Sequence, residues 1–168
     1  MDSSREILWQ PSTEDITSSR LYQYRQWLTS HHGINFSGYE SLWHWSVDYP
    51  EVFWETIATF FKVKFHSPYS TILSGGPMPE TIWFDGATLN YAEHVFMGMK
   101  DQEVALLFAN EQGVDMSVSV SEMWREVTKL QRYFKSHGVR RGDRIAGYLP
   151  NIPQATYAFL AATSLGAI

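Results

Sequence analysis

The chain has 168 residues, of which 44% are hydrophobic and 15% aromatic, and a formal net charge of −5. This apolar content is sufficient for a folded core and excludes a disordered, solvating chain. The charge is mild and the basic residues are dispersed apart from Arg140-Arg141, which argues against nucleic-acid binding. Because cysteine is absent, disulfides and thiolate metal sites are excluded.

The N-terminus, MDSSREILWQPS, lacks the apolar segment of a signal peptide. No apolar run approaches the ~18 residues of a membrane span. These two features predict a soluble, cytoplasmic protein without a membrane span.

The first part of the chain, to about residue 100, has the pattern of an aromatic-rich helical region. One helix is predicted to begin at Ser12 or Thr13 and to run toward His32, with Gly33 as its C-terminal stop. A short helical turn is predicted over 39–45.

A further helix is predicted to begin after Asp48, at Pro50, and to continue through PEVFWETIATFF. Its aromatic and aliphatic residues recur at helical spacing, which is typical of a core and less typical of a ligand-stacking surface. These residues are Phe53, Ile57 and Phe60 on one stripe, widened by Trp54 and Phe61.

The next segment is predicted to be irregular. Residues 74–80 (SGGPMPE) have the composition of a loop, and 83–86 that of a turn. Asn90 is predicted to cap a short helix, YAEHVF, with Glu93 three residues later as in a capping box.

From about Glu103 the periodicity changes. A buried strand is predicted over 104–110, a turn over 111–115 and a returning strand over 116–120. Ser121 is expected to cap a helix that ends at His137 and Gly138. The apolar stripe of this helix is Met123, Val127, Leu130 and Phe134.

The last stretch predicts a turn at Gly142-Asp143, a buried strand over 144–149, and a helix over 154–168 capped by Asn151. This helix carries no charge on any face, and a helix that is apolar all round is buried on more than one side. Nothing follows it in the sequence that could cover it. We therefore expect the front part of a larger protein, with an exposed apolar helix that could drive self-association.

The order strand, strand, helix, strand, helix is the opening of an α/β layer structure. The predicted fold class is α/β with a helical lead-in. The predicted division is a helical N-terminal cap over 1–100 and the start of an α/β domain over 101–168.

The sequence contains no phosphate-binding loop. Neither G-x-G-x-x-G nor G-x-x-x-x-G-K-[ST] occurs, and Pro77 removes a backbone donor directly after Gly75-Gly76. Arg141-Gly142-Asp143 is interpreted as a turn that opens a strand.

The histidines are interpreted as structural or exposed. His31-His32 lies at a helix end, and adjacent helical residues do not face one another. His44 is expected to be half-buried beside the aromatic residues, and Glu93-His94 lacks the second histidine of a zinc helix. The residues alone therefore predict no catalytic, cofactor-binding or metal residue.

Three stretches resemble the AMP-forming acyl-CoA synthetases of the adenylate-forming superfamily. GVRRGDRIAGYLPN at 138–151, followed by SLGAI at 164–168, is similar to their G-x-x-x-G-D-R-V and P-N segment. WFDGATLNYAEH at 83–94 and YESLWHWSVDYPEVFW at 39–54 resemble the acetoacetyl-CoA synthetases in particular.

The resemblance implies a ligase that activates acetoacetate with ATP and Mg²⁺ to an acyl-adenylate and transfers the acyl group to coenzyme A. The phosphate loop, adenine motif, ribose-binding Asp and catalytic Lys of the family match no position here. We therefore expect an inactive, structural segment. Its matched residues would fix a chain crossing and a turn; these are Trp83, Phe84, Gly86, Leu89 and Asn90, and Gly142 and Asp143. The five lysines match no family motif; they are Lys62, Lys64, Lys100, Lys129 and Lys135.

Two alternatives remain open. One is a synthetase for another short acid, such as propionate or a hydroxy acid. The other is a naturally short, non-catalytic protein that binds or regulates a partner through its apolar C-terminal helix.

Overall fold

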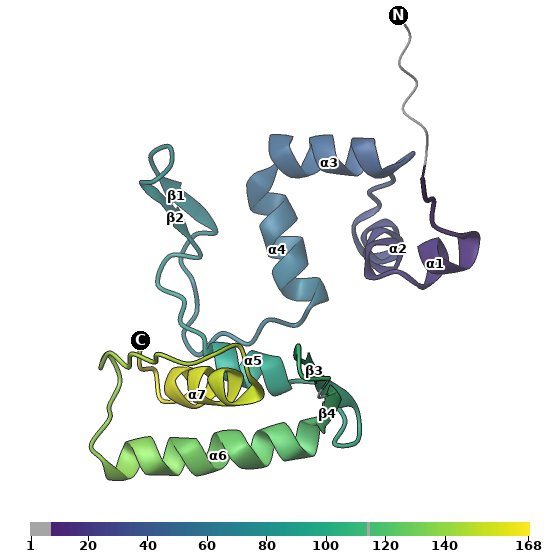
Figure 1. Ribbon diagram of the computed structural model, residues 1–168. Coiled ribbons are helices and arrows are strands. Elements are labelled where there is room, and N and C mark those ends of the chain that lie inside the picture. Colours follow the sequence, from purple (N-terminus) through teal and green to yellow (C-terminus); the bar gives the residue numbers. More distant parts are fainter. Residues whose placement is uncertain (1–7, 114) are drawn as a thin grey trace, which may run out of the picture. The chain divides into compact units, whose positions relative to one another are not determined.

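The computed structural model describes residues 8–113 and 115–168, and these form two compact units. The first unit contains the described residues up to Val63 together with Tyr69–Gly86; the second contains Lys64–Pro68 and Ala87–Ile168. The chain therefore passes from one unit to the other three times. Each unit is built from helices and one two-stranded antiparallel sheet, so the predicted mixed fold with a helical lead-in is confirmed (Figure 1).

The first unit contains four helices, and the predicted first helix is in fact two. α1 (Thr13–Ser18) and α2 (Arg20–His32) are separated by Ser19, whose backbone is extended at φ −66°, ψ 148°. The Ser19 hydroxyl accepts a hydrogen bond from the Tyr22 N–H at 3.1 Å, so this serine caps α2 instead of continuing α1. Gly33 ends α2 in the left-handed conformation, as predicted.

The next two helices, α3 (Tyr39–Asp48) and α4 (Pro50–Phe60), complete the core of this unit. Tyr24, Leu28 and Leu42 are buried at its centre, and the Tyr24 hydroxyl lies 2.7 Å from that of Thr56. The predicted α4 stripe is confirmed: Phe53, Ile57 and Phe60 pack against this centre, with Trp27, Phe36 and Trp45.

The stripe is narrower than predicted. Trp54 is 42% exposed and Phe61 52% exposed, so neither widens the buried face. Trp54 instead meets Trp83 edge to face, with ring centroids 5.7 Å apart. α3 also extends beyond the single turn predicted for it.

The segment predicted as a loop and a turn forms a hairpin. β1 (Leu73–Gly75) pairs antiparallel with β2 (Thr81–Trp83), with Gly75 opposite Thr81. Gly75 has φ +83°, and a Cβ there would clash with the carbonyl oxygen of Glu80. Residues 76–80 remain a turn between the strands, as their composition predicts.

The second unit contains α5 (Tyr91–Phe96), β3 (Val104–Ala109), β4 (Asp115–Ser119), α6 (Val120–Ser136) and α7 (Pro153–Ser164). β3 and β4 pair antiparallel, as predicted. The turn predicted over 111–115 includes Val114, which lies outside the described residues.

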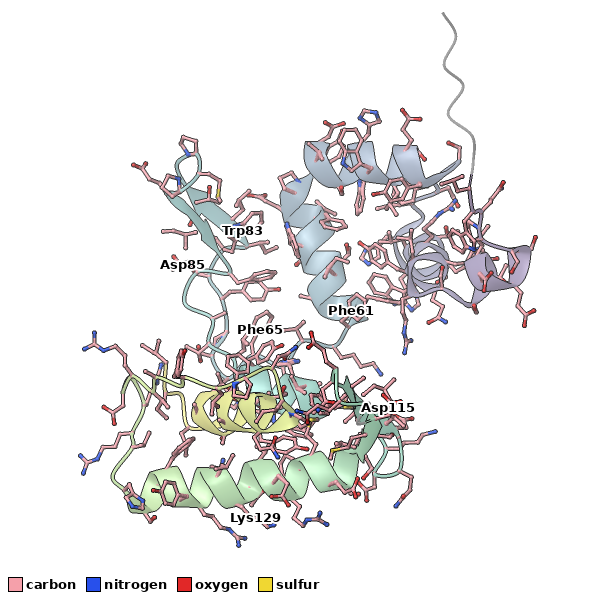
Figure 2. The ribbon with its side chains drawn as sticks, in the orientation of Figure 1. Phe61, Phe65, Trp83, Asp85, Asp115 and Lys129 are labelled. Atoms are coloured by element: carbon pink, nitrogen blue, oxygen red, sulfur yellow. The ribbon has the colours of Figure 1, made fainter. Side chains whose placement is uncertain are left out.

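The core of this unit lies where the three helices meet. Met123 and Val127 of α6 are buried against α7, with Leu130 and Phe134 packed beside them, so the predicted stripe is confirmed. The other buried members are Ala92, Val118, Tyr157, Leu160 and Ala161. Figure 2 shows Lys129 on the side of α6 that points away from α7.

Three predictions for this unit are wrong. Ser119, and not Ser121, caps α6, because its hydroxyl accepts from the Glu122 N–H at 3.3 Å. Residues 144–149 form no strand. β3 is not buried, since Leu107 is 82% exposed. A strand needs a hydrogen-bonded neighbour and a covered face, and in the described part of the chain β3 has only β4 beside it.

The last helix also differs from its prediction. Ile152 occupies the N-cap position without a side-chain hydrogen bond, and the helix ends at Ser164; Pro153 lies in the first turn, as expected for proline. α7 is not uncovered, because α5 and α6 pack on it and bury Tyr157 and Leu160. Among the described residues, no helix combines the length and apolar character needed to cross a membrane.

Candidate functional site

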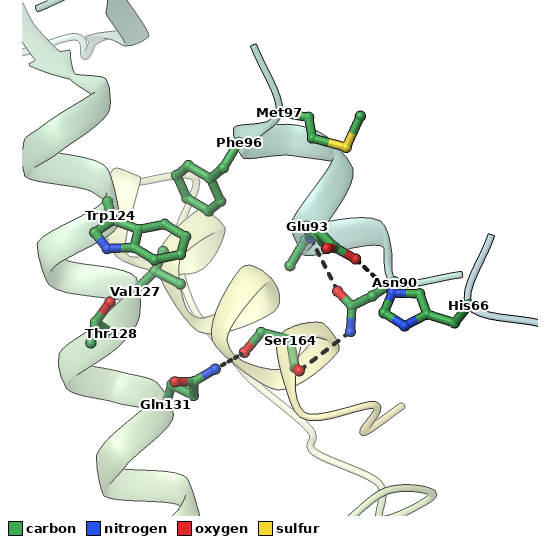
Figure 3. Close-up of a pocket in the computed structure, with 11 residues that line it drawn as sticks. His66, Asn90, Glu93, Phe96, Met97, Trp124, Val127, Thr128, Gln131 and Ser164 are labelled. Carbon is green, nitrogen blue, oxygen red and sulfur yellow. Dashed lines mark hydrogen bonds and ion pairs between the residues drawn. The ribbon is translucent and has the colours of Figure 1, made fainter. Parts of the chain in front are cut away.

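A cavity of about 510 Å³ lies between α5, α6 and α7, entirely within the second unit (Figure 3). Its apolar wall includes Phe96 and Trp124, whose rings meet edge to face with centroids 4.7 Å apart. The size is that of a small-molecule site. The remaining lining residues are His66, Asn90, Ala92, Glu93, Met97, Val127, Thr128, Gln131 and Ser164.

Asn90 is the polar centre of this site. Its side-chain oxygen accepts the Glu93 N–H at 3.1 Å and caps α5. Its amide nitrogen donates to the carbonyl oxygens of Thr163 at 3.1 Å and Ser164 at 3.3 Å. These carbonyls belong to the last turn of α7, and that of Thr163 also accepts from the Gly166 N–H at 2.9 Å. Asn90 thus joins the start of α5 to the end of α7.

Gln131 makes a second link, from α6 to α7. Its side-chain nitrogen donates to the Ser164 hydroxyl at 2.8 Å, and that hydroxyl donates to the Ala161 carbonyl at 2.7 Å. The hydroxyl is therefore held in a structural network. The polar groups of this cavity connect helices, and this arrangement supports a scaffold role.

A cluster of charged residues lies at the edge of the cavity. The Glu93 carboxylate binds the Lys64 ammonium through one oxygen and the His66 imidazole, at 2.6 Å, through the other. The Lys64 N–H donates to His94 Nε2 at 3.1 Å. The hydrogen bonds from Lys64 and then His66 hold the pKa of Glu93 below its usual range.

This cluster corrects the capping box predicted for α5. Asn90 accepts from the Glu93 N–H as expected, but the Glu93 side chain is directed to Lys64 and His66 instead of back to the cap. No local pattern predicts the cluster, because Lys64 and His66 precede Glu93 by 29 and 27 residues along the chain. The adjacent Glu93-His94 pair is the part of the cluster that the sequence analysis considered.

The other histidines are placed as follows. His31 and His32 both pack on Trp27, with ring centroids 5.1 and 4.9 Å away. His44 is exposed on α3 beside Trp43, and not half-buried as predicted. Within 8–113 and 115–168, no three His, Asp or Glu residues are grouped as metal ligands would be.

The two segments predicted as turns without chemistry are turns. Gly75-Gly76 lies in the β1–β2 hairpin, where the Glu80 carboxylate approaches Gly76. A carboxylate there opposes a phosphate, so these residues do not fit the triphosphate of ATP. The Arg140 N–H donates to the Asp143 carboxylate at 2.7 Å, and Gly142 has φ +86°.

The aromatic residues at the other matched stretch are also structural. The Phe84 N–H donates to the Ile72 carbonyl at 2.8 Å, and its ring meets that of Tyr69 with centroids 5.2 Å apart. Phe84 has φ +47°, which non-glycine residues rarely adopt. Together with Trp83 on Trp54, these contacts support the predicted role in fixing the chain path.

Comparisons with known proteins support the family resemblance along the chain. Residues 39–95 match the family described as acetyl-coenzyme A synthetase N-terminus, and residues 95–168 match the AMP-binding enzyme family. The two matches together cover residues 39–168 and indicate the class that the chain resembles, the AMP-binding acyl-CoA synthetases.

The particular relatives narrow this class. Acetoacetyl-CoA synthetases of Xenopus tropicalis and Rhizobium meliloti (strain 1021) are 32% and 30% identical, over 97% and 96% of this chain. The structure of acetoacetyl-CoA synthetase from Streptomyces lividans is 41% identical, with a TM-score of 0.86 over 98% of this chain. The chain corresponds to the N-terminal segment of the acetoacetyl-CoA synthetases.

The match covers this chain far more completely than it covers the relatives. The chain spans 24% of the Xenopus protein, 25% of the Rhizobium protein and 26% of the Streptomyces structure. It therefore spans about a quarter of the length of the relatives it matches.

Proposed function

We propose that this chain is the structural N-terminal part of an acetoacetate–CoA ligase. The complete protein would activate acetoacetate with ATP to an acyl-adenylate and transfer the acyl group to coenzyme A. The observation that carries the proposal is the match over 98% of the chain, at 41% identity, to an acetoacetyl-CoA synthetase structure. The polar network that joins α5, α6 and α7 supports the structural role of this segment.

The substrates and the metal would bind through other parts of the complete protein. A carboxylate needs a better leaving group before a thiol can displace it, and Mg²⁺ would offset the phosphate charge in that step. The described residues include no grouped ligands for Mg²⁺. The Gly75-Gly76 turn opposes phosphate. We therefore derive no step of the reaction from this chain.

The division of the chain is part of the same proposal. Residues 1–100 would form the N-terminal cap and 101–168 the start of the AMP-binding domain; the two family matches meet at residue 95. We also propose a cytoplasmic location for the complete protein, to be tested by cell fractionation.

Acetoacetate-dependent exchange between ATP and pyrophosphate tests the activity. The complete protein should catalyse this exchange, and the 168-residue chain should not. Exchange by the chain alone would refute its structural assignment, and no exchange by the complete protein would refute the ligase assignment.

A second acid substrate is supported by one relative. A malonamoyl-CoA synthetase of Penicillium aethiopicum is 27% identical over 97% of the chain. Malonamic acid and acetoacetic acid both carry a carbonyl group two carbons from the carboxylate. Competition between the two acids on the complete protein would decide between them.

A further inference from the structure

Glu93 is used differently from the two other acidic residues at the third position of a helix with a side-chain cap. In α1 and α6 this residue completes a capping box: Asp15 accepts from the Ser12 N–H at 2.9 Å, and Glu122 accepts from the Ser119 N–H at 2.9 Å. Glu93 holds the same position in α5, yet its carboxylate is directed to Lys64 and His66.

Lys64 and His66 belong to a short strap, residues Lys64–Pro68. The residues before and after the strap, Val63 and Tyr69, belong to the first unit, whereas the strap itself belongs to the second. The strap is therefore a short segment in which the chain leaves the first unit, joins the second beside α5 and then returns to the first. Its place in the second unit must come from non-covalent contacts.

Hydrogen bonds to the segment before α5 and to α5 itself hold the strap. Its middle pairs with the segment before α5: the His66 N–H donates to the Thr88 carbonyl at 2.7 Å, and the Ser67 and Thr88 hydroxyls are 2.8 Å apart. The Lys64 and His66 side chains both meet the Glu93 carboxylate, and the Lys64 N–H donates to His94 Nε2 at 3.1 Å. The strap is thus attached to α5 through Glu93, which binds two of its side chains, and through His94, which binds its backbone.

Glu126 is a useful comparison, because it binds two side chains of its own helix whereas Glu93 binds two from another segment. It also binds two basic side chains, Arg125 at 3.3 Å and Lys129 at 2.8 Å, and its exposure (34%) resembles that of Glu93 (31%). Both its partners are on its own helix, so its ion pairs cannot hold one segment to another. Those of Glu93 close loops of 27 and 29 residues.

We propose that Glu93 is a latch that holds the strap 64–68 against α5. His66 and Glu93 both line the cavity, so the latch lies at its edge (Figure 3). Release of the latch leaves 64–68 held by its remaining contacts, which include those with Thr88 and His94.

Amide hydrogen exchange of the full chain tests this proposal, with Glu93→Gln compared to Glu126→Gln. Both variants remove one carboxylate charge from a residue that binds two basic side chains. Glu93→Gln should raise exchange at the Lys64 and His66 amides roughly fivefold, the scale of a favourable exposed ion pair. The Val127 and Leu160 amides should not change, and Glu126→Gln should leave the strap unchanged.

A second variant keeps the test specific. Lys64→Met should raise strap exchange on its own and should add less in the presence of Glu93→Gln than in its absence, because the two residues share one interaction. Unchanged strap exchange in Glu93→Gln would overturn the proposal. A uniform rise across α5, α6 and α7 would also overturn it, because Glu93 would then stabilise the whole unit instead of the strap.

Discussion

Asn90 shows how one side chain can connect two distant parts of the sequence. Its oxygen caps α5, and its nitrogen satisfies two carbonyls at the end of α7, more than 70 residues later. The capping half of this role follows from the sequence, since Asn before an apolar segment is a recognised helix start. The other half does not, because it depends on where α7 ends in space.

Asn90→Ala should lower the free energy of unfolding by about 2 kcal/mol, since it removes both a helix cap and two hydrogen bonds. Asn90→Asp keeps the cap acceptor but loses the donor to α7, and should also destabilise. Asn151→Ala is the control: Ile152, not Asn151, occupies the N-cap position of α7, so a change within ~0.5 kcal/mol is expected. Urea unfolding measures all three. An unchanged midpoint in Asn90→Ala would contradict the assigned role.

The exposed carboxylates predict the dependence of stability on pH. Hydrogen bonds from the Ser119 backbone and hydroxyl lower the pKa of Glu122, and those from Ser12 lower that of Asp15. Because these folded-state values lie below the unfolded ones, their contribution is present above about pH 4.3 and is lost as the pH falls through the lowered pKa. Urea unfolding between pH 6 and pH 3 should show this loss. Glu122→Gln should make the loss smaller, and an identical pH profile in that variant would contradict the assignment.

At the scale of elements, the sequence predicts what depends on local pattern and misses what depends on partners. The α4 and α6 stripes and the Gly33 stop are local features, and the structure confirms them. The break at Ser19 is also local, but the helical periodicity continues across it and conceals it. The strand predicted over 144–149 needs a neighbour to pair with, which no pattern within it can supply.

Two serines lie near the start of α6, and Ser119 caps the helix whereas Ser121 does not. Ser119→Ala should cost about 1 kcal/mol, because the Glu122 N–H loses its acceptor. Ser121→Ala should change stability by less than ~0.5 kcal/mol, since Ser121 is already inside the helix. Thermal unfolding of the two variants checks this order, and a larger loss in Ser121→Ala would reverse the assignment.

At the scale of the whole molecule, the candidate site was the least predictable feature. Its polar residues come from the strap, α5, α6 and α7, and each is unremarkable within its own segment. The family resemblance, by contrast, was visible in three stretches and is confirmed by matches along the chain. The family resemblance is thus easier to predict from this sequence than the contacts that form the candidate site.

The open side of β3 predicts self-association of the isolated chain. Leu107 is 82% exposed on a strand that pairs only with β4 among the described residues, and such edges favour association. Sedimentation should show oligomers, and Leu107→Lys should shift them toward monomer. A dispersed monomer with the original sequence would contradict this prediction.

The central claim is that these residues form the structural N-terminal part of a larger ligase. The most direct measurement is the size of the endogenous protein, obtained by blotting cell extract with an antibody against residues 8–100. A band several times heavier than the 19.4 kDa of this chain is predicted. A band at 19.4 kDa alone would contradict the claim and favour a short protein with a binding role.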